Sequence, residues 1–185
     1  MNNVATSKEA LLDISIRLAS EKGFGSLNIR DIAKNGGVSV GCVYNYFPSK
    51  ASLVAATVEK IWESIFHHAS RCGQPAGFLG CVRWIFDSIR SGSERYPSFF
   101  TMHAMSFTAR ELDDGRQVMN RFFEHMKQGL LKALKDDPDI RKDVFHEGFS
   151  ESAYVSFVFD NLITLSTKQA SSCDFLLELI QRSIY

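Results

Sequence analysis

Hydrophobic residues recur at helical spacing along almost the whole chain. We expect the first helix to begin at a capping box formed by Thr6 and Glu9 and to reach about Lys22, where Gly23 stops it. Its apolar face consists of residues three and four positions apart, namely Leu11, Ile14 and Leu18. The same periodicity in the later segments predicts an all-α fold class.

Residues 28–53 contain three helix starts close together. Asn28, with Asp31 three residues later, predicts one capped helix that Gly36-Gly37 ends, and Ser39 is placed to cap a second. Pro48 ends that second helix after about two turns, and Ser49 can cap a third. Two short helices joined by a Gly-containing turn are typical of a helix-turn-helix, whose second helix enters a major groove.

The remaining segments are predicted to be longer helices. The one from Ser49 continues to about Arg71, and we place a domain boundary inside it, giving domains 1–57 and 58–185. A helix follows with Phe78, Val82, Ile85 and Ile89 at i, i+4, i+7 and i+11, and Ser91-Gly92 is expected to end it. Further helices are expected over 97–107, 113–136, 147–168 and from 174 onward.

The helix expected over 147–168 is apolar around most of its circumference, and the helix from 174 onward is also rich in apolar residues. One domain of this size has difficulty covering two such helices, so a second copy of the chain is expected to pack on them. The residues expected at this homodimer contact are Phe157, Asn161, Leu165, Phe175 and Leu179.

The residues around the helix-turn-helix resemble the DNA-binding signature of the TetR family. The match consists of Ile32-Ala33, Gly37-Val38-Ser39, Gly41, Tyr44-Asn45-Tyr46-Phe47, Ser49-Lys50 and Leu53, about a quarter of the chain. The resemblance implies a transcriptional regulator with a helical C-terminal domain that binds a small molecule and forms a four-helix dimer interface. Asn28 and Cys42 depart from it, since the family usually has Thr at the first position and Thr or Ala at the second.

Nine residues are expected to contact double-stranded operator DNA. Asn28 and Ser39 stand at helix N-termini, which favour phosphate, and the resemblance places Tyr44, Tyr46 and Lys50 on phosphates as well. The candidates for the groove are Val40, Gly41, Cys42 and Asn45. Asn45 alone offers a donor and an acceptor, whereas Val40 or Cys42 can meet a thymine methyl. The capping residues can equally be caps and nothing more, and Tyr46 can be a packing residue.

Aromatic and methionine residues are abundant in the C-terminal part. They are candidates to line a pocket for an apolar or aromatic effector, with His103 and Tyr154 as polar handles; the candidates are Trp62, Phe66, Trp84, Phe99, Met102, His103, Phe122, Met126 and Tyr154. The alternative is that most of them are ordinary core residues.

Composition limits the partners and the compartment. The formal net charge is 0, with a slight basic excess in residues 1–60, where seven Lys or Arg face five Asp or Glu (7 − 5 = +2). The four cysteines have no CxxC spacing and the histidines no ligand-pair spacing, so we expect no metal and no cofactor. Without a signal peptide or an apolar run long enough to cross a membrane, we expect a cytoplasmic protein.

These observations predict a DNA-binding repressor, homodimeric and released by a small-molecule inducer, rather than an enzyme. Three alternatives remain. The chain can be an activator or a thiol-redox sensor acting through Cys42, a helical module without DNA binding, or an enzyme using His103 and an acidic residue such as Asp160. No nucleophile elbow, phosphate loop or metal motif supports the last of these.

Overall fold

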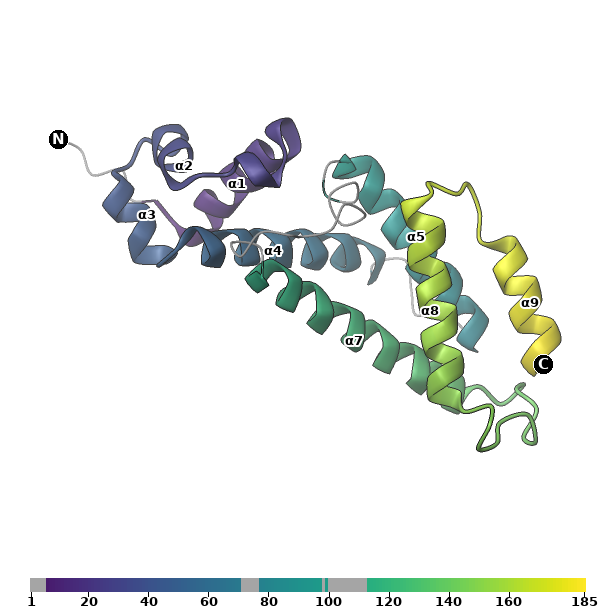
Figure 1. Cartoon of the computed structure of the whole chain (residues 1–185). Helices are drawn as coiled ribbons and strands as arrows, with labels where there is room; N and C mark the ends of the chain where they lie inside the picture. Colours follow the sequence, from purple (N-terminus) through teal and green to yellow (C-terminus); the bar gives the residue numbers. More distant parts are fainter. Residues whose placement is uncertain (1–5, 71–76, 98, 100–112) are drawn as a thin grey trace. The chain divides into compact units, whose positions relative to one another are not determined.

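The computed structural model describes residues 6–70, 77–97, 99 and 113–185, which form helices joined by turns (Figure 1). The all-α fold class is confirmed. The elements are α1 Lys8–Lys22, the short 3-10 helix η1 Phe24–Ser26, α2 Ile29–Asn35, α3 Val40–Tyr46, α4 Lys50–Ser70, α5 Gly77–Arg95, α7 Asp113–Asp136, α8 Glu151–Thr167 and α9 Asp174–Ile184. The helix expected over 97–107 lies almost entirely outside the described residues.

Side-chain caps start the N-terminal helices. The Asn28 Oδ1 accepts the Asp31 backbone N–H at 2.8 Å while its Nδ2 donates to the Asp31 carboxylate at 2.8 Å, so the predicted reciprocal cap is confirmed. The predicted cap of α1 was wrong by one residue. The Ser7 Oγ, rather than the Thr6 hydroxyl, accepts the Ala10 N–H at 3.1 Å, because α1 begins at Lys8.

Helix α4 also has the predicted cap. Ser49 and Ser52 exchange hydrogen bonds, each backbone N–H donating to the other residue's Oγ at 3.0 Å. The 21 residues of α4 make it about 30 Å long, which agrees with the long helix expected from Ser49.

The described chain forms two compact units. One includes residues up to 64 and from 93 to 121, and the other includes residues 65–92 and 122–185. Helices α4, α5 and α7 each contribute to both units. The functional division into 1–57 and 58–185 stays a prediction, because compactness does not decide where DNA binding ends.

The first unit has a dense core around α1, α2, α3 and the first half of α4. Leu11, Ile32, Val43 and Leu53 are completely buried. A buried polar contact joins α1 to α4, since the Ser15 and Thr57 hydroxyl oxygens lie 2.8 Å apart. The Thr57 hydroxyl also lies 2.7 Å from the Leu53 carbonyl oxygen and donates to it, so this buried pair is satisfied within the protein.

Helix α5 continues past the glycine that was expected to end it. Gly92 lies inside α5, and a Cβ added there would lie 2.7 Å from the Ile65 Cγ1 and 2.8 Å from its Cδ1. The glycine therefore permits close packing of α5 on α4 inside the second unit and does not stop the helix. The sequence signal was misread because close approach and helix termination both favour glycine.

We expect Gly92→Ala to lower the free energy of unfolding by about 1–3 kcal/mol, because the new methyl group overpacks against Ile65. An exposed helical glycine behaves in the opposite way. Gly129 in α7 has open space around its Cα, so Gly129→Ala should raise stability by up to about 1 kcal/mol. Urea unfolding at one protomer concentration measures both. A stabilised Gly92→Ala would contradict the close-packing role.

Asp137 joins the ends of three helices in the second unit. Its carboxylate follows α7, accepts the Phe78 N–H at the start of α5 at 2.7 Å, and accepts the Tyr185 hydroxyl after α9 at 2.5 Å. Burial alone would raise the pKa of Asp137, but the hydrogen bonds from Tyr185, Phe78 and Asp139 lower it below its ordinary value. The carboxylate is therefore a charged structural link.

The start of α8 also differs from the expectation of about Glu147. His146 and Phe149 exchange backbone hydrogen bonds of 3.1 and 2.9 Å, and this tight turn occupies the residues expected to be the first helical turn. Ser150 then caps α8 by accepting the Ala153 N–H at 3.3 Å, so the helix begins at Glu151.

Candidate nucleic-acid interface

Helices α2 and α3 form a helix-turn-helix in the first unit. Gly36-Gly37 makes the turn, in which Gly37 has a φ of +64°, a conformation that disfavours residues with a Cβ. The Val38 N–H donates to the Ala33 carbonyl at 3.0 Å and closes the end of α2. The Ser39 Oγ then accepts the Cys42 N–H at 3.1 Å and starts α3. Caps and glycine together fix the angle between the two helices.

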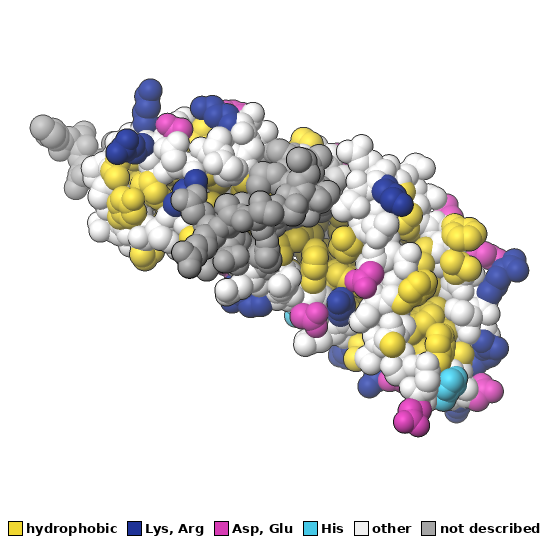
Figure 2. Space-filling view, in the orientation of Figure 1, with side chains coloured by type: hydrophobic (Ala, Val, Ile, Leu, Met, Phe, Trp, Pro, Cys, Tyr) yellow, Lys and Arg dark blue, Asp and Glu magenta, His cyan; other side chains and the backbone are white. Residues whose placement is uncertain are grey.

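The outer face of α3 is defined by which residues are buried. Val43 is completely buried against the core, and helical geometry at about 100° per residue places Gly41 and Asn45 on the opposite side, where both are exposed. Val40 and Tyr44 lie on one flank of that face with exposed fractions of 39% and 48%. Figure 2 shows hydrophobic side chains at the surface over this part of the chain. An exposed apolar and amide face of this kind is free to meet a partner.

Gly41 has no structural reason to be glycine inside the described chain. Its φ is not positive, and the nearest atom to an added Cβ is the Ser39 Oγ at 3.9 Å. Glycine in a helix costs roughly 1 kcal/mol relative to alanine, so the absence of a side chain lowers stability without relieving any clash in the protein. The glycine leaves the backbone of α3 open to close approach from outside.

The residues predicted on phosphates have different surroundings. Tyr44 is exposed and Lys50 is half-buried at the start of α4. The Tyr46 hydroxyl donates to the Thr6 carbonyl oxygen at 2.8 Å and so ties the segment before α1 to the end of α3, a contact that the sequence did not indicate. The amide of Asn28 serves its own cap through both its donor and its acceptor. Ser39 is exposed as well, and its hydroxyl caps α3.

A second exposed apolar surface lies on α8 and α9, which are consecutive antiparallel helices (Figure 1). Phe157, Phe175 and Leu179 have exposed fractions of 55%, 78% and 44%, and Figure 2 shows yellow side chains along this region. Asn161 and Leu165 are half-buried one and two turns after Phe157 on α8. All five residues predicted at the dimer contact therefore lie on two neighbouring helices, and three of them are large and exposed.

The residues predicted to bind an effector are divided between the two units. In the first unit, Trp62 and Phe99 are each 1% exposed, and their ring centroids are 5.5 Å apart in an edge contact. In the second unit, Phe66 and Trp84 have ring centroids 5.6 Å apart. Phe122 is half-buried and Met126 buried in α7. Met102 and His103 lie outside the described residues.

Tyr154 is fully engaged in the structure. Its hydroxyl pairs with the Ser183 Oγ at 2.6 Å, and its ring contacts Phe78, Phe145 and Phe149. Burial raises the pKa of Tyr154, so the phenol stays protonated. Its role as a polar handle for an effector stays a prediction, and it would require the bond to Ser183 to be exchanged for one to the ligand.

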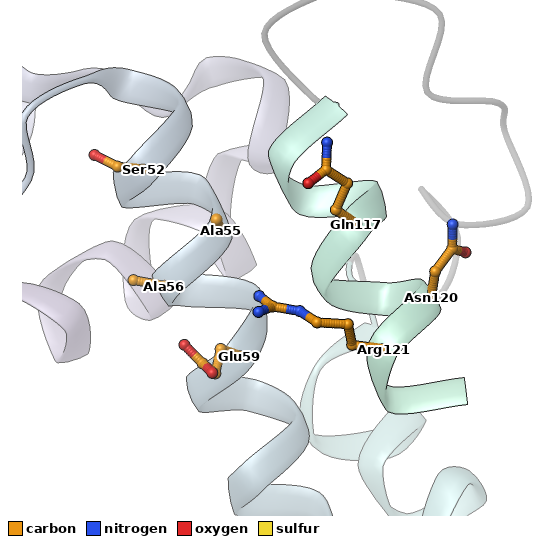
Figure 3. A pocket seen from close by; sticks show the side chains of 7 residues that line it. All are labelled: Ser52, Ala55, Ala56, Glu59, Gln117, Asn120 and Arg121. Carbon is orange, nitrogen blue, oxygen red and sulfur yellow. The ribbon is translucent and has the colours of Figure 1, made fainter. Parts of the chain in front are cut away.

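Two described grooves lie elsewhere, and none of the nine effector candidates lines them. One, of about 570 Å³, lies between α4 and α7 in the first unit and is lined by Ser52, Ala55, Ala56, Glu59, Gln117, Asn120 and Arg121. In Figure 3, Arg121 extends from α7 toward α4. The sequence does show a row of small residues on α4 at this place, a signal that was missed. The other groove, of about 400 Å³, lies between α5 and α9 and includes Arg83, paired with Asp174 at 2.8 Å, and Gln181.

Metal-binding clusters and membrane-spanning helices are absent from the described part of the chain. No three His, Cys, Asp or Glu residues there are grouped so as to hold a metal ion. No helix within residues 6–70, 77–97 and 113–185 has the length and apolar character needed to cross a bilayer. Cys42, Cys81 and Cys173 are free thiols.

A capped helix-turn-helix with an outward-facing second helix, followed by further helices, defines a DNA-binding regulator. Comparison with known proteins agrees. The family model described as "Bacterial regulatory proteins, tetR family" matches residues 11–57. The HTH-type transcriptional repressor KstR of Rhodococcus jostii (strain RHA1) is 30% identical over 175 residues, covering 90% of this chain and 76% of KstR.

Two further similarities extend beyond the helix-turn-helix. The nucleoid occlusion factor SlmA of Vibrio cholerae serotype O1 is 27% identical over 133 residues, which are 70% of this chain and 66% of SlmA. The crystal structure of the transcriptional regulator FadR from Bacillus subtilis, in complex with stearoyl-CoA, superposes with a TM-score of 0.68 at 14% identity, covering 97% of this chain and all of FadR. The chain belongs to the TetR family of bacterial regulatory proteins. It is a transcriptional regulator and not an enzyme.

Proposed function

We propose that this regulator is a repressor that binds a near-palindromic operator as a homodimer and is released by an apolar or aromatic small molecule. The observation that carries the proposal is the outer face of α3, where Val40, Gly41, Tyr44 and Asn45 are exposed while Val43 on the other side is completely buried. Val40, Gly41, Cys42 and Asn45 face the bases, and Ser39, Tyr44, Tyr46, Lys50 and Asn28 lie nearest the phosphates. Acting on DNA, the protein works in the cytoplasm.

Two copies of the helix-turn-helix, each called a reading head below, are needed for tight binding. A single helix-turn-helix makes few contacts, whereas a dimer places two of them about one helical turn, ~34 Å, apart on DNA. The exposed stripe of Phe157, Phe175 and Leu179 is the surface through which we propose that two copies pair. Large apolar side chains exposed on two consecutive helices support an interface at this surface. Its isologous pairing gives the two-fold symmetry of a palindrome.

The effector is proposed to act through α4. This helix follows α3 in the chain and contributes to both compact units. A ligand that tilts α4 therefore changes the position of the helix-turn-helix, the reading head. Release requires the ligand to bind the DNA-free form more tightly than the DNA-bound form. An apolar effector agrees with the aromatic content of this chain and with the stearoyl-CoA in the FadR complex. The name of KstR, a repressor, supports repression.

A salt-dependent mobility-shift series with the DNA flanking the protein's own gene tests the proposal. We expect specific retention whose logarithmic affinity falls linearly with the logarithm of salt. Lys50→Ala should weaken binding and reduce that slope by about 1, and Tyr44→Ala should weaken binding about 5- to 10-fold. Lys132→Ala, which removes an exposed lysine of α7, is the matched control and should change neither. Absence of retention at low salt would contradict the proposal.

A further inference from the structure

We infer that α3 reads A·T base pairs, with Asn45 on an adenine and Val40 against a thymine methyl, so that each operator half-site has A·T pairs under the middle of this helix. The inference rests on the proposed function and names the base class that the same site recognises. It follows from which side chains are exposed on α3, which are already engaged, and which chemical groups the helix lacks.

Asn45 is at the centre of the outer face. It lies one turn after Gly41, on the side of α3 opposite the buried Val43, and it is exposed. Because Gly41 has no side chain and open space around it, the backbone can approach the floor of the groove at this level. This close approach brings a short side chain such as asparagine within reach of a base edge. Gly41 and Asn45 therefore act together.

The amide of Asn45 is uncommitted. Asn28 uses its amide in its cap, the Asn35 Nδ2 donates to the Asp31 carbonyl at 2.8 Å, and the Asn161 Nδ2 donates to the Phe157 carbonyl at 2.8 Å. The Asn45 side-chain amide has no hydrogen bond to any residue that the structure describes. An adenine in the major groove offers the complementary pair, because its N7 accepts from the amide Nδ2 and its N6 amino group donates to Oδ1.

The composition of α3 excludes the usual contacts to G·C pairs. Its seven residues, Val40 to Tyr46, include no Lys or Arg to donate two hydrogen bonds to guanine O6 and N7. They also include no Asp or Glu to accept from the cytosine N4 amino group. The Tyr46 hydroxyl is already bonded to the Thr6 carbonyl. Among the groove candidates Val40, Gly41, Cys42 and Asn45, Asn45 is the residue whose side-chain amide offers a separate donor and acceptor for one base edge.

Val40 adds a thymine contact on the flank of the same face. It is 39% exposed, and a β-branched valine at an exposed helix position lowers helix propensity slightly without adding a buried contact. The C5 methyl of thymine is the apolar group of the major groove, and an aliphatic side chain meets it favourably. Val40 and Asn45 point about 140° apart around α3, so they contact different base pairs of one half-site.

Selection from a random duplex library, followed by substitution of single bases, tests the inference. The selected half-sites should contain adenine at one position that the wild type prefers by about 5- to 150-fold over other bases. Replacing that adenine by 7-deazaadenine, which lacks the N7 acceptor, should weaken the wild type about 3- to 10-fold and leave Asn45→Ala unaffected. Replacing the contacted thymine by deoxyuridine should weaken the wild type about 2- to 4-fold and leave Val40→Ala unaffected.

Two further variants separate base reading from other roles. Asn45→Arg should move the preferred base toward guanine, and Asn120→Ala, at an exposed amide of α7, should leave the selected sequence unchanged. The salt slope of Asn45→Ala should equal that of the wild type, because a base contact releases no counterions. If the position that depends on Asn45 prefers guanine, or if the wild type binds 7-deazaadenine and adenine duplexes equally well, the inference is wrong while the proposed function stands. Failure to enrich any duplex at low salt would overturn the proposed function and the inference with it.

Discussion

Phe175→Asp is expected to convert the protein from a dimer to monomers of 20.8 kDa and to weaken operator binding by at least about 100-fold. Phe175 is 78% exposed on α9, so its replacement removes few contacts within its own protomer. In a two-fold interface each protomer contributes its own Phe175, so the substitution removes two phenylalanines from the interface. Burying one phenylalanine contributes about 1.5–3 kcal/mol, so the pair removes roughly 3–6 kcal/mol before the cost of burying two carboxylates is added.

Analytical ultracentrifugation and far-ultraviolet circular dichroism measure this expectation. The mass should fall from twice 20.8 kDa to 20.8 kDa at low micromolar concentration, while the far-ultraviolet spectrum stays helical. Gln181→Glu is the matched control. It adds one negative charge to the same helix, on the flank that lies beside Arg83, and should leave the mass unchanged. A Phe175→Asp protein that remains dimeric would place the interface elsewhere.

Gly41→Leu is expected to abolish specific DNA binding while leaving the fold as stable as the wild type or more stable. An added side chain at Gly41 meets no atom closer than the Ser39 Oγ at 3.9 Å, so the protein itself tolerates it. Leucine also has the higher helix propensity by roughly 0.8 kcal/mol. On DNA the same side chain holds the backbone of α3 away from the bases, and Asn45 then loses its reach. We expect at least about a 100-fold loss of affinity, the size of the lost base contacts.

Gly129→Leu separates this steric effect from a general one. Gly129 is a second exposed helical glycine with nothing near its Cα, and it lies in α7. Urea unfolding should show a similar gain for both variants, and a mobility shift should show the loss of binding for Gly41→Leu only. Equal binding by Gly41→Leu and the wild type would mean that DNA does not approach α3 at this residue.

The helix-turn-helix was predictable because its determinants are local in sequence. Asn28 and Ser39 each cap a helix through an N–H three residues away, and Gly37 needs its positive φ whatever the rest of the chain does. The errors occurred where distant contacts or competing neighbours decide. Ser7 displaced Thr6 as a cap because two hydroxyl residues stood side by side. Gly92 is a packing residue because Ile65, far away in sequence, lies against it.

The candidate sites divide in the same way. The exposed residues of α3 follow from the periodicity of one helix, and the exposed Phe157 and Phe175 follow from helices too apolar for one domain. The effector candidates share only their residue type, and residue type does not determine which side chains contact one another. Trp62 and Phe99 form one contact, Phe66 and Trp84 another, and Tyr154 bonds to Ser183. Tertiary packing, rather than composition, decides which aromatic residues line a cavity.

Hydroxyl-radical footprinting of the wild type on a selected duplex tests most directly whether a dimer presents two copies of α3 to DNA. We expect two protected tracts related by a dyad, with centres one helical turn, about 10 base pairs, or a whole multiple of it apart. Both tracts should vanish together in Phe175→Asp at the concentration where the wild type protects fully. A single protected tract, or two tracts without a dyad between them, would contradict a symmetric pair of reading heads.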